Sequence, residues 1–213
     1  VDRIHKIGMK VMVWFSVPFV GKWDPVQPGV ENKVYLRFKD MMLNENVQTF
    51  HFDPRYKEVR DYLIETYVSH VKEWGIDGVK LDFIDSFSLN GRSLEYDERR
   101  DYQSLEDAID VLMTDVTETL RAINSEVLIE FRQSYVGPAI RKYGNMLRVA
   151  DCPNDAICNR QDIVNLRLTS GKTAVHSDML MWHVDDPVES AAMQFINVIF
   201  SVPQISVLID KLP

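Results

Sequence analysis

The chain has 213 residues, of which 46% are apolar and 26% are charged, as in an ordinary globular protein of one domain. Its 24 basic and 32 acidic side chains give a formal net charge of −8, and no basic tract occurs, so we expect neither nucleic acid nor an anionic membrane surface as a partner. No apolar run approaches the ~18 residues of a transmembrane helix, which excludes a membrane-spanning protein.

The first half of the chain predicts two strands separated by a long helix. Residues 11–15 (VMVWF) form a short apolar run typical of a buried parallel strand, and residues 17–33, rich in Pro and Gly, predict a loop. Asp53 is the predicted N-cap of a helix whose apolar residues recur at helical spacing until Gly75 ends it. Residues 78–83 (GVKLDF) are the next predicted strand.

The second half continues the alternation of strands and helices. After a polar stretch over residues 90–102, Ser104 and Asp107 resemble a capping box that opens a helix ending near Ile123. The remaining predicted elements are, in chain order, the strands 127–131 and 146–151, the helix 157–169, the strand 173–178, the helix 188–200 and the strand 204–209.

Strands that alternate with helices predict parallel βα units and an α/β fold. Each apolar strand turns polar at its carboxyl end, and these polar ends are Lys80-Leu81-Asp82, Arg132, Asp151 and His176-Ser177-Asp178. In a (β/α)8 barrel such ends share the face that carries the active site, whereas the rival doubly wound sheet usually shows a GxGxxG turn that is absent here. Six strands are two short of a barrel, so we predict a partial (β/α)8 TIM barrel over residues 1–213.

Both ends of the chain look like cut edges of a longer protein. Residues 1–8 resemble the back half of a helix, not a signal peptide, and the last residues (VLIDKLP) follow directly on an apolar stretch. We therefore expect flanking domains of the same chain as partners, while cellular location and homo-oligomer formation stay open. The two cysteines, Cys152 and Cys158, are too few for a disulfide framework or a structural zinc cage and are predicted to be small buried apolar groups.

Two carboxylates on neighbouring strand ends suggest glycoside hydrolysis. Retention of configuration needs a nucleophile and an acid/base about 5–5.5 Å apart, and Asp82 and Asp151 are the best pair. Lys80 lies on the same side of its strand as Asp82 and would keep it ionised, whereas Arg148 could oppose protonation of Asp151 if it points inward. The competing interpretation is structural, because an Asp at a strand end is often a helix cap or a turn former.

The stretch GIDGVKLDF, preceded by FDPRYKEVRDYLIETYVSHVKEWG, resembles glycoside hydrolase family 36, the α-galactosidase or melibiase family. That family carries NPEVRDY and GIDYLKWD, so the resemblance implies that Asp82 is the nucleophile and that Lys80 binds substrate. The family's GLWFEPE strand resembles MVWFSVP, which makes Trp14 a candidate sugar platform. The family's acidic pair there is replaced by Ser16 and Phe19.

Two later segments extend this resemblance. The family's WTSDDTDA strand, which carries the acid/base, is similar to RVADCPNDA, so Asp151 matches the acid/base and Asp155 is the fallback. The family's GAHVS strand resembles residues 172–177, which places His176 and Ser177 at the mouth of the barrel. The resemblance covers almost the whole chain, as strands three to eight of the barrel.

Some motifs depart from family 36 and resemble family 31 of the same clan, the α-glucosidases and α-xylosidases. The CSSGGGRFD motif is missing, and FRQSYVG stands in its place with Arg132. The segment DFID resembles DFGE of family 31, and Asp151-Cys152 resembles its GDC acid/base motif. Both alignments select Asp82 and Asp151.

The resemblance implies a double displacement that needs no cofactor and acts on an α-linked oligosaccharide or glycoside. Lys80, Arg132 and Arg148 are the candidates for binding hydroxyls, and Trp14 and Trp182 for stacking on a sugar ring, although core packing is an alternative for each Trp. His176 and His183 are further hydrogen-bonding candidates or structural histidines.

Two other function classes stay open. The first is a metal-dependent TIM-barrel hydrolase with ligands drawn from His51, Asp53, His176, Asp178 and His183, although no HxH or HExxH spacing occurs. The second is a non-catalytic sugar-binding barrel.

Overall fold

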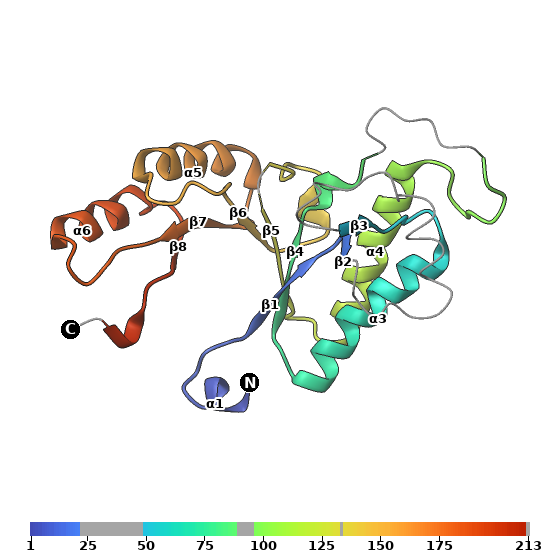
Figure 1. The fold of residues 1–213 in the computed structure, drawn as a ribbon, viewed down its shortest axis with the longest axis horizontal. Coiled ribbons are helices and arrows are strands. Elements are labelled where there is room, and N and C mark those ends of the chain that lie inside the picture. Colours follow the sequence, from blue (N-terminus) through green and yellow to red (C-terminus); the bar gives the residue numbers. More distant parts are fainter. Residues whose placement is uncertain (22–48, 89–95, 133, 212–213) are drawn as a thin grey trace. The chain divides into compact units, whose positions relative to one another are not determined.

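The computed structural model describes residues 1–21, 49–88, 96–132 and 134–211 (Figure 1). The chain divides into two compact units, Val1–Leu128 and Ile129–Pro213. Most of the loop expected over residues 17–33, and residues 90–95 of the expected polar stretch, lie outside the described residues. No helix in the described part of the chain combines the length and apolar character needed to cross a membrane.

The first unit contains a pair of parallel strands and two long helices. Its elements are α1 (Asp2–His5), β1 (Met12–Ser16), β2 (Phe19–Gly21), β3 (Thr49–His51), α3 (Lys57–Trp74), β4 (Gly78–Asp82), the 3-10 turn Ile84–Ser86 and α4 (Leu105–Ile123). Strands β1 and β4 are parallel, with Trp14 opposite Lys80 and Ser16 opposite Asp82. This register brings the carboxyl ends of both strands together.

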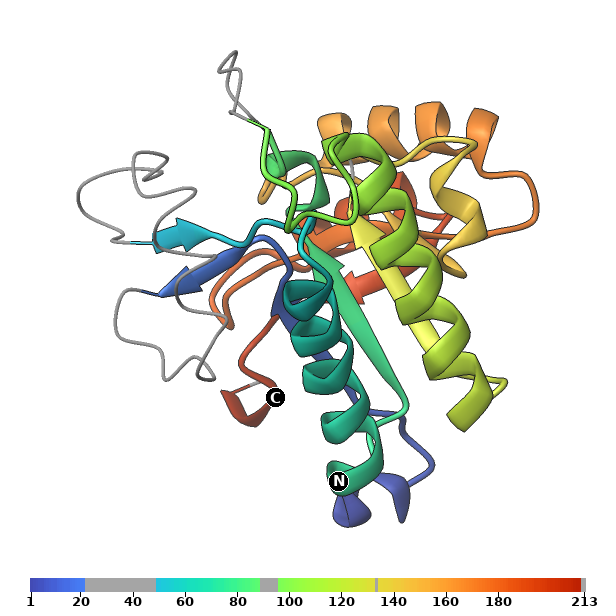
Figure 2. The same ribbon diagram turned by 90° about the vertical axis from the view of Figure 1, so that its right-hand side faces the viewer.

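The predicted apolar stripes form the buried faces of the two helices of this unit. In α3 the buried residues include Val59, Leu63, Tyr67 and Val71, and in α4 they include Leu112, Met113, Val116 and Leu120. The two helices run side by side (Figure 2). Trp74, at the end of the α3 stripe, is exposed because the helix stops at Gly75, which takes the left-handed conformation with φ 64°.

A glycine is required at the start of β4. A Cβ on Gly78 would lie 2.4 Å from the carbonyl oxygen of Leu128, at the start of the next strand. The Leu128 amide donates to the carbonyl of Asp77 at 3.0 Å. The two backbones therefore approach too closely for any side chain.

Two expectations for this unit are wrong. Residues 19–21 form β2, which pairs antiparallel with β3, although their Pro- and Gly-rich surroundings predict a loop. Asp53 is not the N-cap of α3, which begins at Lys57 after Tyr56. The fully buried carboxylate of Asp53 instead accepts a hydrogen bond from the Arg55 amide at 3.1 Å and pairs with the Arg55 guanidinium at 2.9 Å. The buried guanidinium of Arg55 therefore binds the carboxylate that would otherwise cap the helix.

The second unit contains four parallel strands. Its elements are β5 (Leu128–Arg132), which starts at the last residue of the first unit, the 3-10 turn Ile140–Lys142, β6 (Met146–Arg148), α5 (Ala156–Ser170), β7 (Ala174–Leu180), α6 (Val188–Asn197), β8 (Val202–Ile205) and the 3-10 turn Ile209–Lys211. The strands lie in the order β5-β6-β7-β8 (Figure 1), with a register shift between His176 and Met179.

The helices of the second unit differ in how they are held. Asp155 is the N-cap of α5, and its carboxylate accepts a hydrogen bond from the Cys158 amide. Helix α5 packs on β7, whereas α6 buries only Asn197 among its ten residues. Strand β6 ends at Arg148, so Asp151 lies three residues beyond the strand and not at its last position as expected. The whole arrangement is an α/β fold with parallel strands, the partial (β/α) barrel that the sequence predicts.

Candidate active site

Asp82 is the last residue of β4, and its carboxylate is held on both oxygens. It is 5% exposed. Oδ2 accepts a hydrogen bond from the indole Nε1 of Trp14 at 2.9 Å, and Oδ1 accepts one from the Phe83 amide at 2.9 Å. Phe83 has a φ of 65°, which is uncommon for a bulky residue, and the 3-10 turn Ile84–Ser86 begins directly after it. Two donors aimed at one carboxylate fix its direction.

Trp14 lies next to Asp82 and donates a hydrogen bond to it. It lies on β1, beside Asp82 in the register, and its side chain is 52% exposed. Its ring also meets Phe83 edge to face at 6.1 Å between centroids. The sequence predicts a sugar platform here, and the structure adds that the indole N–H orients the neighbouring carboxylate. Lys80, the strand neighbour of Trp14, is half-buried on the same strand as Asp82.

Asp151 lies in the second unit, in the segment after β6, and two arginines bind it. Its side chain is 59% exposed, Arg132 Nη1 lies 2.6 Å from Oδ2, and Arg148 Nη1 lies 2.8 Å from Oδ1. Two guanidinium groups favour the ionised form of a carboxylate. The contact with Arg148, which the sequence leaves open, is therefore present and works against protonation of Asp151.

Arg148 is almost fully buried, at 1% exposed, and its guanidinium donates to several acceptors. Besides Asp151, its guanidinium pairs with Asp178, donates to the Val149 carbonyl at 3.2 Å and donates from Nε to Gln204 Oε1 at 3.1 Å. A buried guanidinium is tolerated only when its donors are satisfied in this way. The arrangement makes Arg148 a rigid support for Asp151.

Glu130 and Gln204 are polar residues in contact with His176 that the sequence does not single out. Glu130 Oε2 lies 2.9 Å from His176 Nδ1 and accepts a hydrogen bond from Gln204 Nε2 at 3.0 Å, so these side chains link β5, β7 and β8. The signal was present, because a glutamate inside the apolar run VLIEF marks a buried charge that needs a partner.

Ser177 is fully buried. Its hydroxyl donates to the Asp178 carbonyl at 2.7 Å and accepts from the Gln204 amide at 2.9 Å, so it joins β7 to β8. Asp178 Oδ2 also accepts a hydrogen bond from the Cys152 amide at 2.6 Å.

Trp182 and His183 lie in the loop that follows β7, where Trp182 packs against Phe195 of α6 at 5.7 Å between ring centroids.

The predicted residues fall into two groups. The first unit brings Trp14 to Asp82, and the second brings Arg132 and Arg148 to Asp151. Asp155, the alternative acid/base, is engaged as the N-cap of α5.

Among the described residues, one cluster could hold a metal ion: Cys152, Cys158 and Asp162, whose ligand atoms lie within 4.8 Å of one another. It includes none of the five ligands that the sequence suggests. Burial, and then the charge of Asp178, raise the pKa of the Cys152 thiol, which opposes the thiolate that a metal needs. Both cysteines are free thiols, with Cys152 buried as predicted and Cys158 partly exposed.

The sequence matches neither a protein-family model nor a curated protein. Several solved structures are similar. A GH36 α-galactosidase from Geobacillus stearothermophilus in complex with stachyose has a TM-score of 0.73 at 16% identity, covering 100% of this chain and 30% of its own. The α-galactosidase from Lactobacillus brevis has a TM-score of 0.69 at 15% identity, covering 100% and 29%.

A cycloisomaltooligosaccharide glucanotransferase from Paenibacillus is also similar, with a TM-score of 0.53 at 16% identity, covering 82% of this chain and 27% of its own. This chain therefore spans about three tenths of the length of these proteins. At such identities the likeness shows the fold.

Proposed function

We propose that this chain carries the catalytic carboxylates of a retaining glycoside hydrolase that cleaves terminal α-galactosides. The observation that carries the proposal is the carboxylate of Asp82, which Trp14 and Phe83 hold at the end of a parallel strand. Carboxyl ends of strands are where barrel enzymes place their chemistry. The α-galactosidases among the structural neighbours share this fold.

Asp82 is suited to be the nucleophile. A nucleophilic carboxylate must present an oxygen in a fixed direction, and two hydrogen-bond donors hold Asp82 in this way. Oδ2 or Oδ1 attacks the anomeric carbon, the bond to the glycosidic oxygen breaks, and a covalent glycosyl ester forms.

Asp151 is the proposed acid/base. It donates a proton to the departing oxygen and then takes one from the water that hydrolyses the ester, which releases a sugar of the original anomeric configuration. Its two arginines stabilise the carboxylate that acts as the base. In the first step it must carry a proton, so we expect Arg132, the more exposed arginine at 18%, to exchange this contact for a sugar hydroxyl and the proton to bind Oδ2, while Arg148 keeps its contact with Oδ1.

The decisive test replaces Asp82 by Asn in the intact protein. Asp82→Asn keeps the shape of the side chain and removes the nucleophile, so hydrolysis of an aryl α-galactoside should fall by about a thousandfold or more. Asp61→Asn, an exposed substitution in an ion pair on α3, is the control and should retain activity. Retained turnover in Asp82→Asn would remove Asp82 as the nucleophile.

The role of Asp151 is tested by varying the leaving group. In Asp151→Ala, the glycosylation step should suffer least for aryl galactosides whose phenol is acidic, because such a leaving group needs no protonation. A loss of equal size across a series of phenols would contradict the acid role. The measurement is kcat/KM against the leaving-group pKa.

The donor sugar has a specific alternative. The glucanotransferase among the neighbours and the DFID segment favour an α-glucoside or α-xyloside. Parallel assays on α-galactosides, α-glucosides and α-xylosides decide between them, and NMR of the first-formed anomer tests retention. The proposal uses no metal, so treatment with a chelator should leave the rate unchanged.

A further inference from the structure

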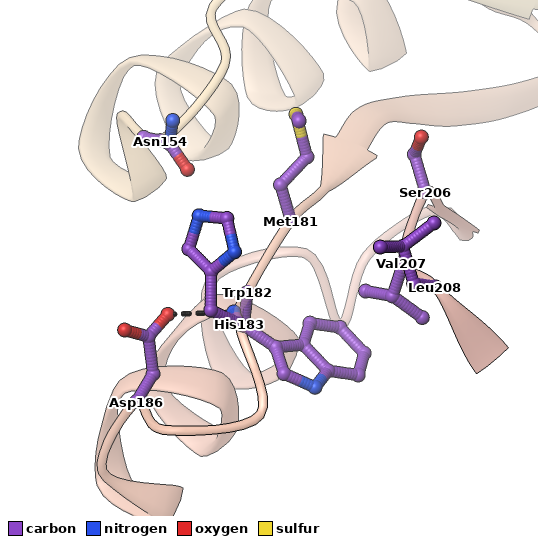
Figure 3. Close-up of a pocket in the computed structure, with 8 residues that line it drawn as sticks. All are labelled: Asn154, Met181, Trp182, His183, Asp186, Ser206, Val207 and Leu208. Atoms are coloured by element: carbon purple, nitrogen blue, oxygen red, sulfur yellow. Dashed lines mark hydrogen bonds between the residues drawn. The ribbon is translucent and has the colours of Figure 1, made fainter. Parts of the chain in front are cut away.

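The loops that follow β6, β7 and β8 enclose a cavity that the proposed catalytic residues do not line. Its volume is about 320 Å³, within the range of small-molecule sites. Its lining comes from these three loops and consists of Asn154, Met181, Trp182, His183, Asp186, Ser206, Val207 and Leu208 (Figure 3). A second cavity of about 220 Å³ shares Trp182, His183 and Leu208 with it and adds Asp185 and Lys211.

The lining combines one aromatic surface with groups that can bind hydroxyls. Trp182 is half-buried and braced by Phe195, so its indole is held in place. Figure 3 shows the imidazole of His183 extending toward Asn154, while the indole of Trp182 extends toward Leu208. An indole face with amide and imidazole groups around it suits a pyranose ring, which has an apolar face and a polar rim.

Hydrogen bonds close the turn that carries part of the cavity lining. The His183 amide donates to Asp186 Oδ2 at 2.8 Å, and the Asp186 amide donates to the His183 carbonyl at 3.1 Å, which closes the turn that carries both residues. Asn154 has a φ of 62°, a left-handed conformation that Asn tolerates better than most residues. Sites built on closed turns lose little entropy on binding.

The sequence position of Asn154 links the cavity to the proposed acid/base. Asn154 lies three residues after Asp151, in the segment that leads into α5. An acid/base must contact the glycosidic oxygen, so the leaving group extends from the side where the acid/base lies.

From this arrangement we infer that the cavity is the subsite for the leaving-group sugar of an α-linked oligosaccharide, with Trp182 stacking on the ring and Asn154 and His183 binding its hydroxyls. The second cavity then accepts the next sugar. This inference rests on the proposed function, because it takes Asp151 as the acid/base, and it adds a preference for oligosaccharides over simple glycosides.

The test compares two substrates that share a donor sugar. Melibiose has a glucose leaving group, whereas α-galactosyl fluoride releases only fluoride and leaves the cavity empty. In Trp182→Ala and Asn154→Gly, the ratio of kcat/KM for melibiose to kcat/KM for the fluoride should fall about tenfold or more. Asn154→Gly is the sharper variant, because glycine tolerates the positive φ and only the amide is lost.

Matched variants separate binding from damage to the fold. Trp182→Phe retains a ring and should restore most of the ratio, whereas Trp74→Ala removes an exposed Trp of α3 that does not line the cavity and should leave the ratio unchanged. An unchanged ratio in both Trp182→Ala and Asn154→Gly overturns the inference while the hydrolase proposal stands.

A binding measurement covers the case in which the proposed function fails. If the intact protein hydrolyses no α-glycoside or glycosyl fluoride, saturation-transfer NMR with glucose still reports on the cavity. Glucose should receive saturation from the intact protein and should lose most of it in Asn154→Gly and Trp182→Ala. Equal transfer in all three proteins, or no transfer in the intact one, contradicts the inference.

Discussion

Asp77 shows how one carboxylate holds the start of two parallel strands. Its Oδ2 accepts hydrogen bonds from the Val11 amide at 2.7 Å and from His5 Nε2 at 2.7 Å. Burial alone would raise its pKa, but these two contacts outweigh burial, and the net pKa is lowered from its usual value. A lowered pKa in the folded state means that folding is favoured by the ionised form.

The first prediction follows from the lowered pKa of Asp77. The stabilisation from Asp77 is complete above the pKa of an unfolded Asp, about 3.9, and is lost as the pH falls through the lower folded pKa. Asp77→Asn should therefore reduce the free energy of unfolding by about 1–2 kcal/mol at neutral pH, and the difference from the parent should shrink as the pH falls below about 4. Urea unfolding at several pH values measures it.

The control for this prediction is Asp61→Asn. Asp61 also pairs with a cation, Lys57, but its side chain is 55% exposed. Exposed pairs of this kind contribute about 0.3–0.5 kcal/mol, so its loss should be barely measurable at any pH. A cost for Asp77→Asn that stays constant from neutral to acid pH would show that the charge does not matter.

At the scale of elements, helix ends were predictable because they depend on neighbouring residues. Ser104 accepts a hydrogen bond from the Asp107 amide at 3.1 Å, as the spacing predicts, and Gly75 closes α3 in the left-handed conformation. The pairing of β2 with β3 was not predictable in this way, since it joins residues 19–21 to residues 49–51 across a long stretch of sequence. Asp53 carried a convincing local signal, but a buried ion pair with Arg55 overrode it.

The cap of α4 gives the second prediction. Ser104→Ala removes the acceptor for one amide of the first helical turn and should cost about 1 kcal/mol of unfolding free energy. Ser104→Asp is the matched variant, because it retains an acceptor and adds a negative charge near the helix N-terminus, so it should match or exceed the parent. Thermal unfolding of the three proteins is the measurement. Equal melting temperatures for Ser104→Ala and Ser104→Asp would show that the cap does not hold the helix.

At the scale of the whole molecule, the sequence predicted the class of fold, whereas the surroundings of the candidate carboxylates were not predictable from it. Polar residues at strand ends selected Asp82 and Asp151 because the carboxyl ends of parallel strands share a face. The sequence could not show that the Trp14 indole donates to Asp82 or that Arg148 links Asp151 to Asp178, since each contact joins residues on different strands or segments. Such contacts depend on side-chain direction as well as on spacing.

The net charge of −8 of this chain gives the last prediction, which concerns the proposed hydrolysis of α-galactosides. A negatively charged protein repels anions over about 30 Å at 10 mM salt but over only about 3 Å at 1 M. A neutral sugar is not repelled at either salt concentration. For a neutral aryl α-galactoside, kcat/KM should therefore change less than about twofold across this range of salt. The same glycoside with a carboxylate on its aryl ring should gain in kcat/KM as salt rises, because screening removes the repulsion. A neutral substrate whose kcat/KM varies as strongly as that of the anionic one would contradict a site built for uncharged sugars, provided that the melting temperature stays constant over the same salts.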